Sequence, residues 1–419
     1  MTPRDYQRPA IQRLVELLPR FGAAVEGSDT GVGKTYIAAF TAKRLGWPVA
    51  VVCPKAVIPS WRDCLAAVGV RALFIENVEK LKADRKWATP VKDGWQWALP
   101  ERCLLIVDEA HRFSGAESSN AKLLWSAPKP VLMMSATLAE SPLKMRALMH
   151  QLGFVHRDEW YRWCFSNGCR KNLPFQGLIF LGGEEVLHKL HAQVFGERGS
   201  RIKIADLGTA FPENSVETVL VPIEDTAALD QTYLDALSEL EAEAPSAAVA
   251  MLRARQQSEH LKLPACIDMI DDLLDQGHSV AVFVNFTDTL SRLKYRFPAA
   301  GLIHGEQTAS ERELDIEQFQ TNESRLIICM IQAGGVGISL HDLHGGHPRV
   351  SILFPTWSAI ELRQALGRIH RNGGQTPCIQ RILFADGTIE QRVLQKLNKK
   401  LDNMDALNDG DLSLNETND

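Results

Sequence analysis

Short apolar runs alternate with amphipathic stretches along most of the chain. The runs are rich in β-branched residues, and the stretches between them have their apolar positions at helical spacing. Strands that are separated by helices form parallel sheets, because a parallel pair needs a long crossover connection. The pattern begins again after residue 263, so we predict an α/β fold with two parallel sheets. The predicted strands are 21–25, 49–52, 72–75, 104–107 and 131–134, then 216–221, 280–284, 326–329, 350–354 and 379–384.

The alternation weakens in the middle of the chain. Between 153 and 211 the periodicity is poor, and four aromatic residues cluster at 160–165, which we interpret as core aromatics of a packed connector. The acidic, alanine-rich stretch 224–250 predicts a solvated helix. We therefore expect one domain over 1–150, a connector with an aromatic insertion over 151–215, a second domain over 216–402 and a frayed acidic tail over 403–419.

Composition limits where nucleic acid could bind and where the protein resides. The formal net charge is -5, so any contact with nucleic acid must be a local cationic stripe on an acidic body. The 8 cysteines include no CxxC pair, which favours reduced core thiols over a zinc site. The amino terminus lacks the apolar core of a signal peptide, and no apolar run is long enough to span a membrane. We expect a cytoplasmic or nucleoid-associated protein that is neither secreted nor bound to a membrane.

The sequence SDTGVGKT at 28–35 follows a predicted strand and precedes a predicted helix at 36–45, which is the context of a P-loop. The glycines allow the backbone N–H groups to point at phosphate oxygens, Lys34 would reach the β and γ phosphates, and Thr35 would bind Mg²⁺. Ser28 stands where the consensus has glycine, and an ordinary glycine turn is the alternative for the motif alone. The predicted cofactors are ATP and Mg²⁺. The expected phosphate contacts are Asp29, Thr30, Gly31, Val32, Gly33, Lys34 and Thr35.

Two carboxylates end the apolar strand before residue 108. Asp108 is placed to hold Mg²⁺, and Glu109 is the candidate general base that orients the attacking water. A solvated strand end is the alternative, but a P-loop upstream makes it the poorer interpretation.

SDTGVGKT, DEAH (108–111) and SAT (135–137), in that order, resemble motifs I, II and III of the superfamily 2 helicases and translocases. The stretch 51–61 is similar to motif Ia of the Swi/Snf-type ATPases, and EWYRWC (159–164) is similar to their annealing-helicase branch. QALGRIHRN (364–372) resembles motif VI. The resemblance extends from residue 5 to about 400. It implies two RecA-like lobes with the ATP site in the cleft between them.

In the first half, the resemblance implies that Gln7 reads the adenine edge and that Lys55 contacts DNA phosphates. Ser135 and Thr137 would couple the nucleotide state to the grip on nucleic acid. Two departures weaken the match, because Ser114-Gly115 follows DEAH in place of Lys-Asn, and Ser200 replaces the first arginine of an RRxK landmark.

In the second half, the match to motif VI implies that Arg371 is an arginine finger and that Arg368 is a second phosphate contact, with Gln364 beside them. A planar guanidinium on a separate lobe would stabilise transition-state charge only when the lobes close. The stretch 330–340 resembles motif V, which implies that Gly334 and Gly335 approach DNA and that Gly337 approaches the nucleotide. The usual threonine of this motif is absent.

We expect a DNA-dependent ATPase that translocates on or remodels duplex or branched DNA as ATP closes the lobes around Lys34, Glu109 and Arg371. A strand-separating helicase acting on single strands of DNA or RNA is the alternative within the enzyme class. An ATP-gated nucleic-acid-binding scaffold is the alternative of another class, although a pure binder would not need both Glu109 and Arg371. We expect a monomeric motor and leave open whether a partner protein recruits it.

Overall fold

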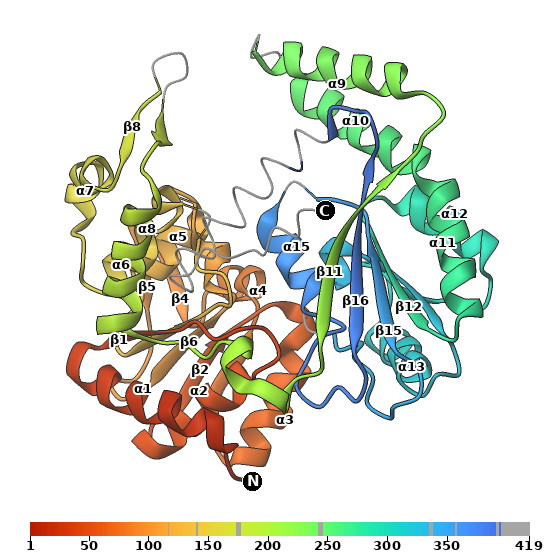
Figure 1. Ribbon diagram of the computed structural model, residues 1–419. Coiled ribbons are helices and arrows are strands. Elements are labelled where there is room, and N and C mark those ends of the chain that lie inside the picture. Colours follow the sequence, from red (N-terminus) through yellow and green to blue (C-terminus); the bar gives the residue numbers. More distant parts are fainter. Residues whose placement is uncertain are drawn as a thin grey trace. The chain divides into compact units, whose positions relative to one another are not determined.

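The computed structural model describes residues 1–115, 117–139, 141–172, 177–241, 246–334, 338–356, 358–390 and 394. The chain forms two compact units that divide between Leu207 and Gly208 (Figure 1). The segment 151–215, which we expected to form a connector, lies in unit 1 as far as residue 207. The expected acidic tail, 403–419, lies outside the described residues.

Within the described residues, unit 1 is built on a six-stranded sheet in the order β10-β1-β7-β6-β2-β3, and every pair of neighbours is parallel. Four of the strands coincide with or lie within one residue of their predicted bounds, and β1 is shifted toward the P-loop. The strands are β1 (Ala23–Glu26), β2 (Val49–Val52), β3 (Ala72–Glu76), β6 (Leu104–Asp108), β7 (Val131–Met134) and β10 (Gly199–Ser200).

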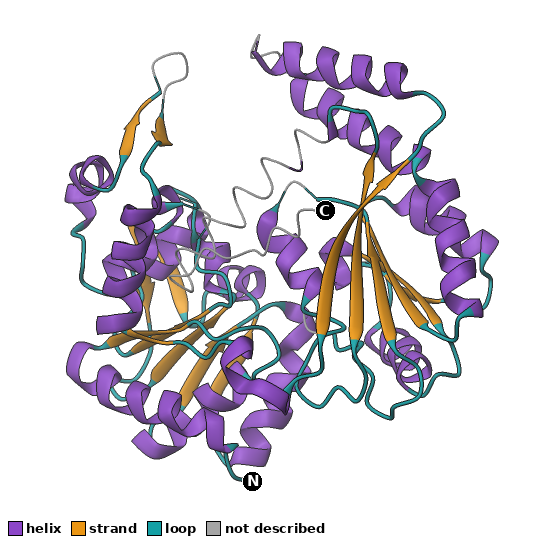
Figure 2. Ribbon diagram, in the orientation of Figure 1, coloured by secondary structure: helices purple, strands orange, loops and turns teal. Residues whose placement is uncertain are grey.

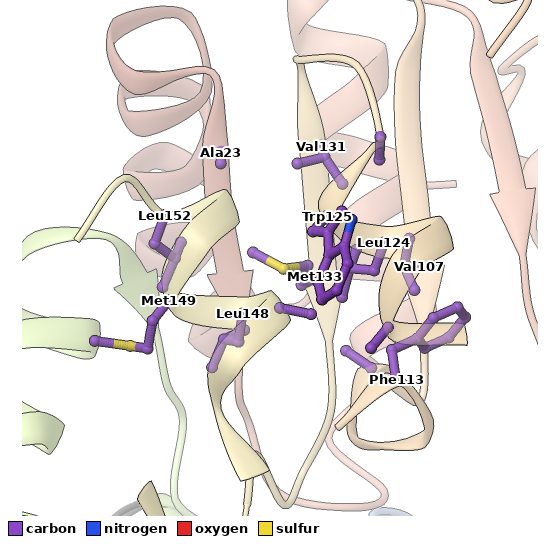
Figure 3. Packing of buried hydrophobic residues seen from close by; sticks show 14 of the residues in the cluster. Ala23, Val107, Phe113, Leu124, Trp125, Val131, Met133, Leu148, Met149 and Leu152 are labelled. Carbon is purple, nitrogen blue, oxygen red and sulfur yellow. The ribbon is translucent and has the colours of Figure 1, made fainter. Parts of the chain in front are cut away.

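Both faces of this sheet are buried, as is typical of a parallel sheet covered by helices. Along β1, Ala23 and Val25 belong to one hydrophobic cluster and Ala24 belongs to another. The first cluster packs against α5, α6 and α8, as Figure 3 shows for Leu124, Leu148 and their neighbours, and the second packs against α1, α2 and α3. The helices are α1 (Arg8–Phe21), α2 (Lys34–Leu45), α3 (Ile58–Val68), α4 (Val78–Asp84), α5 (Ser119–Trp125), α6 (Arg146–Gln151), α7 (Trp160–Ser166) and α8 (Glu184–His191).

Unit 2 contains a second six-stranded parallel sheet among its described residues, in the order β11-β16-β15-β12-β14-β13 (Figure 2). Its strands are β11 (Asn214–Val221), β12 (Ser279–Val284), β13 (Gly301–Ile303), β14 (Leu326–Met330), β15 (Arg349–Leu353) and β16 (Cys378–Ala385). The helices of this unit are α9 (Thr226–Glu241), α10 (Ala247–Leu261), α11 (Leu263–Asp275), α12 (Thr287–Arg296), α13 (Ala309–Gln320), α14 (Ile331–Gly334) and α15 (Ala359–Leu366). Two parallel α/β sheets match the predicted fold class of two RecA-like lobes.

Two antiparallel hairpins extend unit 1, and the sequence pattern predicted neither. One pairs β4 (Ala88–Val91) with β5 (Gly94–Trp97), and the other pairs β8 (Cys169–Lys171) with β9 (Leu178–Phe180). Strands of three or four residues have too few positions for an alternating pattern to be recognised. Within the described ranges, every helix is too short or too polar to span a lipid bilayer.

Two interpretations of the middle segment need correction. Of the aromatic residues expected in the core, Trp160 is 3% exposed, but Tyr161 is 63% exposed and Phe165 is 38% exposed. The acidic stretch expected to be a solvated helix forms α9 and the start of α10, and Leu229 and Tyr233 of α9 are buried. Tertiary packing of one helix face against α10 and the end of β16 outweighs the polar composition in that stretch.

Candidate active site

The P-loop joins β1 to α2 at the carboxyl edge of the unit 1 sheet. Gly31 and Gly33 have φ angles of 94° and 88°, which only glycine adopts without strain. A Cβ atom on Gly33 would also lie 2.6 Å from Nε2 of Gln7. The curled backbone that we expected for phosphate binding therefore forms, and α2 begins with Lys34 directly after it.

Lys34 is held by the loop itself. Its Nζ donates hydrogen bonds to the carbonyl oxygens of Ser28 and Asp29, at 2.8 and 3.0 Å. Burial lowers the pKa of Lys34, whereas the neighbouring carboxylates, Glu109 first among them, act in the opposite direction. The lysine therefore lies among acidic groups at the position from which it would meet phosphates.

Gln7 is 4% exposed and contacts the same loop. Its Nε2 donates to the carbonyl oxygen of Val32 at 2.9 Å, and its Oε1 accepts from the backbone N–H of Arg4 at 3.1 Å. A glutamine amide carries two N–H groups and two oxygen lone pairs. These two bonds use one of each, so the amide keeps one donor and one acceptor with which it can read an adenine edge.

A pocket of about 450 Å³ lies beside this turn, which is within the size range of small-molecule sites. Its lining combines aromatic and cationic side chains, including Tyr6, Arg13, Phe195, Arg201 and Lys203. The hydroxyl of Tyr6 donates to the carbonyl oxygen of Val32 at 3.2 Å, which connects the pocket to the P-loop.

Residues 200–204, here called the clamp segment, fix the first half of the P-loop. Arg201 Nη2 lies 2.9 Å from Asp29 Oδ1, and the backbone N–H of Ile204 donates to Asp29 Oδ2 at 2.8 Å. Arg201 Nη1 also donates to the carbonyl oxygen of Gly27, and the N–H of Ile202 donates to Ser28 Oγ at 2.9 Å. The carboxylate of Asp29, which we expected to contact the nucleotide, is therefore engaged on both oxygens by the clamp segment.

Asp108 ends β6, which pairs with β7, and β7 pairs in turn with the P-loop strand β1. Its Oδ2 accepts a hydrogen bond from Trp61 Nε1 at 2.8 Å, and its Oδ1 accepts from the N–H of Glu109 at 2.9 Å. Burial, followed by the charge of Glu109, raises the pKa of Asp108 to about 6. Sequence reasoning did not assign a role to Trp61, because Trp61 lies 47 residues before Asp108 and only the folded structure brings them together.

Glu109 has a left-handed backbone, with φ 53° and ψ 51°. A non-glycine residue with this conformation is uncommon and is enriched at functional sites. Its Oε2 lies 3.3 Å from Nδ1 of His111, which is also 2.9 Å from Ser135 Oγ. Burial lowers the pKa of His111 to about 4, so a neutral imidazole connects Glu109 to Ser135.

Ser135 and Thr137, which we expected to act on nucleic acid, are buried, with exposures of 0% and 1%. Ser135 Oγ donates to the carbonyl oxygen of Thr137 at 2.7 Å and accepts from its N–H at 3.2 Å. In this structure they contact each other and His111. Lys55, by contrast, is exposed in the short turn Lys55–Val57 that follows β2.

Glu26 is a site residue that sequence reasoning missed. It ends β1 with its side chain fully buried, and its Oε1 accepts from the N–H of Ser28 at 3.2 Å. Burial raises the pKa of Glu26 to about 7, although Lys34 and Arg201 act in the opposite direction. An acidic residue at the end of an apolar run was the available signal, as it was for Asp108.

The motif VI arginines lie after α15 in unit 2 and are bound to the segment 338–340. Arg371 donates to Ser339 Oγ at 2.8 Å and to the carbonyl oxygen of Gly367 at 3.0 Å. Arg368 is 3% exposed and donates to the carbonyl oxygen of Ile338 at 3.3 Å. Gln364 is also buried, at 8% exposure, on α15. Of the glycines expected to approach the ligands, Gly334 ends α14, and Gly335 and Gly337 lie outside the described residues.

Comparison with known proteins identifies the family of this chain. The helicase conserved C-terminal domain matches residues 262–373. A protein of Acanthamoeba polyphaga mimivirus, named as an ATP-dependent RNA helicase, is 34% identical over 97% of this chain and 84% of its own length.

More distant relatives are longer than this chain. The mouse SWI/SNF-related regulator of chromatin, subfamily A member 1, is 22% identical over 95% of this chain, and the match covers 42% of that protein. A solved SWI2/SNF2 ATPase core of Sulfolobus solfataricus in complex with dsDNA is 17% identical, with a TM-score of 0.40 over 94% of this chain and 90% of that one. This chain therefore belongs to the superfamily 2 helicases of the Swi/Snf type, a family of ATP-hydrolysing, helicase-like enzymes.

Proposed function

We propose that this protein is a DNA-dependent ATPase that translocates on or remodels duplex or branched DNA. The observation that carries the proposal is the cluster of Lys34, Asp108 and Glu109 at one edge of a parallel sheet, in a chain that belongs to a helicase family. A P-loop lysine beside two strand-end carboxylates is the arrangement that phosphoryl transfer requires.

ATP and Mg²⁺ fit the residues present. Asp108 is a half-buried carboxylate with a raised pKa, and its described hydrogen bonds come from Trp61 and the Glu109 N–H and not from a lysine or arginine, so a nearby cation would stabilise its charged form. Thr35, the second residue of α2, would offer its hydroxyl to the same ion. Bound Mg²⁺ would neutralise charge on the β and γ phosphates. The remaining amide donor and acceptor of Gln7, together with the adjoining pocket, favour the nucleoside end of ATP at that turn.

Glu109 is the group that we propose to orient and deprotonate the attacking water. Its contact with neutral His111 connects it to Ser135 and Thr137, so a shift of Glu109 during hydrolysis would reach motif III. Arg371 and Arg368 would supply positive charge to the transferring phosphoryl group, as arginines do in related phosphoryl-transfer sites. We propose that Gln364 supports them from α15.

One exposed lysine and the names of two relatives bear on which nucleic acid the protein binds. The exposure of Lys55 supports a contact with phosphates, and the mouse relative is named as a regulator of chromatin, which favours DNA. The mimivirus relative is named as an RNA helicase, which favours a strand-separating RNA helicase as the second candidate. An ATP-gated scaffold remains the third.

Steady-state ATPase assays can separate these three functions. ATP hydrolysis is measured without a polymer and with single-stranded DNA, blunt duplex DNA, forked DNA or single-stranded RNA, each at two salt concentrations. Arg102→Ala, which removes an exposed arginine of unit 1, shows how much the loss of one surface charge alone changes the stimulation. We expect duplex or forked DNA to stimulate hydrolysis most and the stimulation to fall steeply with salt. Greater stimulation by RNA than by any DNA would overturn the DNA assignment, and no stimulation by any polymer would favour the scaffold.

A further inference from the structure

Trp61 is a buried residue of α3 that lies at the carboxyl edge of the unit 1 sheet. The buried residues of this helix are Trp61, Cys64, Leu65 and Val68. They are three or four residues apart and so form one stripe on the helix, with Trp61 first in the chain. Because β2 ends at Val52 and α3 begins at Ile58, the first turn of the helix lies at the carboxyl edge of the sheet. Packing that leaves Trp61 only 1% exposed therefore fixes its indole ring at the edge where Asp108 lies.

The indole N–H of Trp61 donates to a carboxylate, and Nε1 lies 2.8 Å from Asp108 Oδ2. A packed tryptophan needs an acceptor for this N–H, and a backbone carbonyl is sufficient. Trp97 of β5 shows that solution, because its Nε1 donates to the carbonyl oxygen of Leu123 at 3.3 Å. A hydrogen bond to an ionised acceptor is shorter and stronger than one to a neutral acceptor. The bond from Trp61 therefore satisfies the indole and also constrains the side chain that we assign to Mg²⁺.

Two neutral donors hold the Asp108 carboxylate, one on each oxygen. Trp61 donates to Oδ2, and the backbone N–H of Glu109 donates to Oδ1 at 2.9 Å. The last torsion of an aspartate side chain is soft, so donors on both oxygens are what determine the plane of the carboxylate. An ionised carboxylate has about four acceptor positions, and these two bonds occupy two of them. The two donors thus orient Asp108, leave acceptor positions for water molecules of a metal ion, and add no positive charge that would repel it.

We propose that Trp61 is a positioning residue for the metal site, because its indole N–H orients the Asp108 carboxylate for Mg²⁺. Trp61 would contact neither the ion nor the nucleotide. Hydrogen-bond partners of metal-binding side chains typically change metal affinity or activity by about 10- to 100-fold when they are lost. The inference rests on the proposed function and adds to it a residue of α3 that acts on the metal and not on the nucleotide.

Trp61→Phe tests this role, because it removes the N–H and keeps an aromatic ring in the core. The affinity of the purified full-length protein for a fluorescent ATP analogue is measured with and without Mg²⁺, and the ratio of the two affinities is the Mg²⁺ gain. We expect the Mg²⁺ gain to fall by about tenfold in Trp61→Phe, while the affinity without Mg²⁺ stays unchanged. Trp47→Phe makes the same substitution at a half-buried tryptophan of the same hydrophobic cluster and should change neither affinity.

A double variant tests whether Trp61 acts through Asp108. Asp108→Asn removes the charge that would attract the ion, so adding Trp61→Phe to it should lower the Mg²⁺ gain no further. A further fall in the double variant would overturn the proposal. Equal losses of affinity with and without Mg²⁺ in Trp61→Phe would also overturn it, because they would indicate a purely structural role.

The same titrations separate this inference from the proposed function. If the Mg²⁺ gain of the unchanged protein persists in Trp61→Phe, this inference fails and the proposed function stands. If the gain falls in Trp61→Phe but no polymer stimulates ATP hydrolysis, the inference stands and the dependence on DNA fails. If Mg²⁺ has no effect on nucleotide affinity in the unchanged protein, the inference and the proposed metal site both fail.

Discussion

The candidate catalytic groups of the two units differ in the charge of the groups around them. In unit 1, charged groups face one another: Lys34 lies among Glu26, Asp108 and Glu109, and burial shifts the pKa values of Lys34, Glu26 and Asp108. In unit 2, the hydrogen bonds of Arg371 to Ser339 and Gly367 join a charge to neutral partners. Guanidinium groups keep their charge in almost any surroundings, whereas carboxylates and lysines respond strongly to burial.

Under the proposed function, this difference predicts that the unit 1 groups act mainly in nucleotide binding and that Arg371 of unit 2 acts mainly in hydrolysis. The unit 1 cluster holds opposed charges whose balance changes when phosphates arrive, so losing one member should impair nucleotide binding itself. A guanidinium bonded to a hydroxyl and a backbone carbonyl can exchange those partners for a phosphate oxygen at modest cost, because each such bond contributes only about 1–3 kcal/mol. Loss of Arg371 should therefore impair hydrolysis with little effect on binding.

The largest effect is expected for Lys34→Ala. The substitution removes the cation that offsets four carboxylates and that would contact the β and γ phosphates, so ATP binding and turnover should both fall to background. The measurement is ATPase activity together with titration of a fluorescent ATP analogue. Lys92→Ala, at an exposed lysine of the same unit, should behave as the unchanged protein does. Retained ATP affinity in Lys34→Ala would break the proposed contrast between the units.

Arg371→Ala should lower the rate of ATP hydrolysis by about 10³-fold while ATP binding remains measurable, because an arginine finger acts on transition-state charge. Single-turnover hydrolysis and equilibrium binding of the nucleotide separate the two effects. Arg292→Ala, at a half-exposed arginine of α12 that pairs with Asp288, serves as the control in unit 2. An unchanged rate in Arg371→Ala would reject the finger assignment.

Substitutions that break the contacts of the clamp segment should have a smaller effect. They should change ATP binding and the stability of the protein more than the rate of the chemical step. Asp29→Asn and Arg201→Gln each remove one side of a bridge in which the arginine is 5% exposed. We expect each to raise the KM for ATP by about tenfold and the double variant to be no worse, since contacting residues couple by about 0.5–3 kcal/mol. Urea unfolding and ATPase kinetics measure the two quantities. Asp84→Asn, at an exposed helix end, is the control, and strictly additive effects would contradict a direct bridge.

The sequence predicted the parts of the site that are local. A glycine-rich turn after an apolar run and a carboxylate at a strand end each depend on a few adjacent residues, so the P-loop and the Asp108 strand end could be located before the structure. The parallel sheets followed from the alternation of strands and helices, and most strand bounds came within two residues. The catalytic roles assigned to these residues stay predictions.

The parts that escaped prediction depend on contacts distant in sequence. The bond from Trp61 to Asp108 spans 47 residues, and the bridge from Arg201 to Asp29 spans 172. No periodicity encodes such pairs, because they arise where strands become neighbours in the sheet. The orientation of Tyr161 and Phe165 was misjudged for a related reason, since aromatic composition gives the apolar area of a segment but not the face that another element covers.

The last expected effect concerns stability instead of activity, and it tests whether the buried carboxyl group of Glu26 is neutral in the folded protein. Burial raises the pKa of Glu26 from about 4.5 to about 7, so between these values the folded state binds a proton that the unfolded state does not. The stabilisation by the neutral form is complete below pH 4.5 and is lost as pH rises through 7, at a cost on the order of 3 kcal/mol. Glu26→Gln mimics the neutral carboxyl group, so it should unfold at higher urea than the unchanged protein at pH 8 and match it at pH 5. Tryptophan fluorescence follows this transition, and Glu101→Gln, at an exposed position, should leave the pH dependence unchanged. Parallel curves for Glu26→Gln and the unchanged protein from pH 5 to 8 would mean that Glu26 is already compensated, and the contrast between the two units would then rest on Asp108 and Lys34 alone.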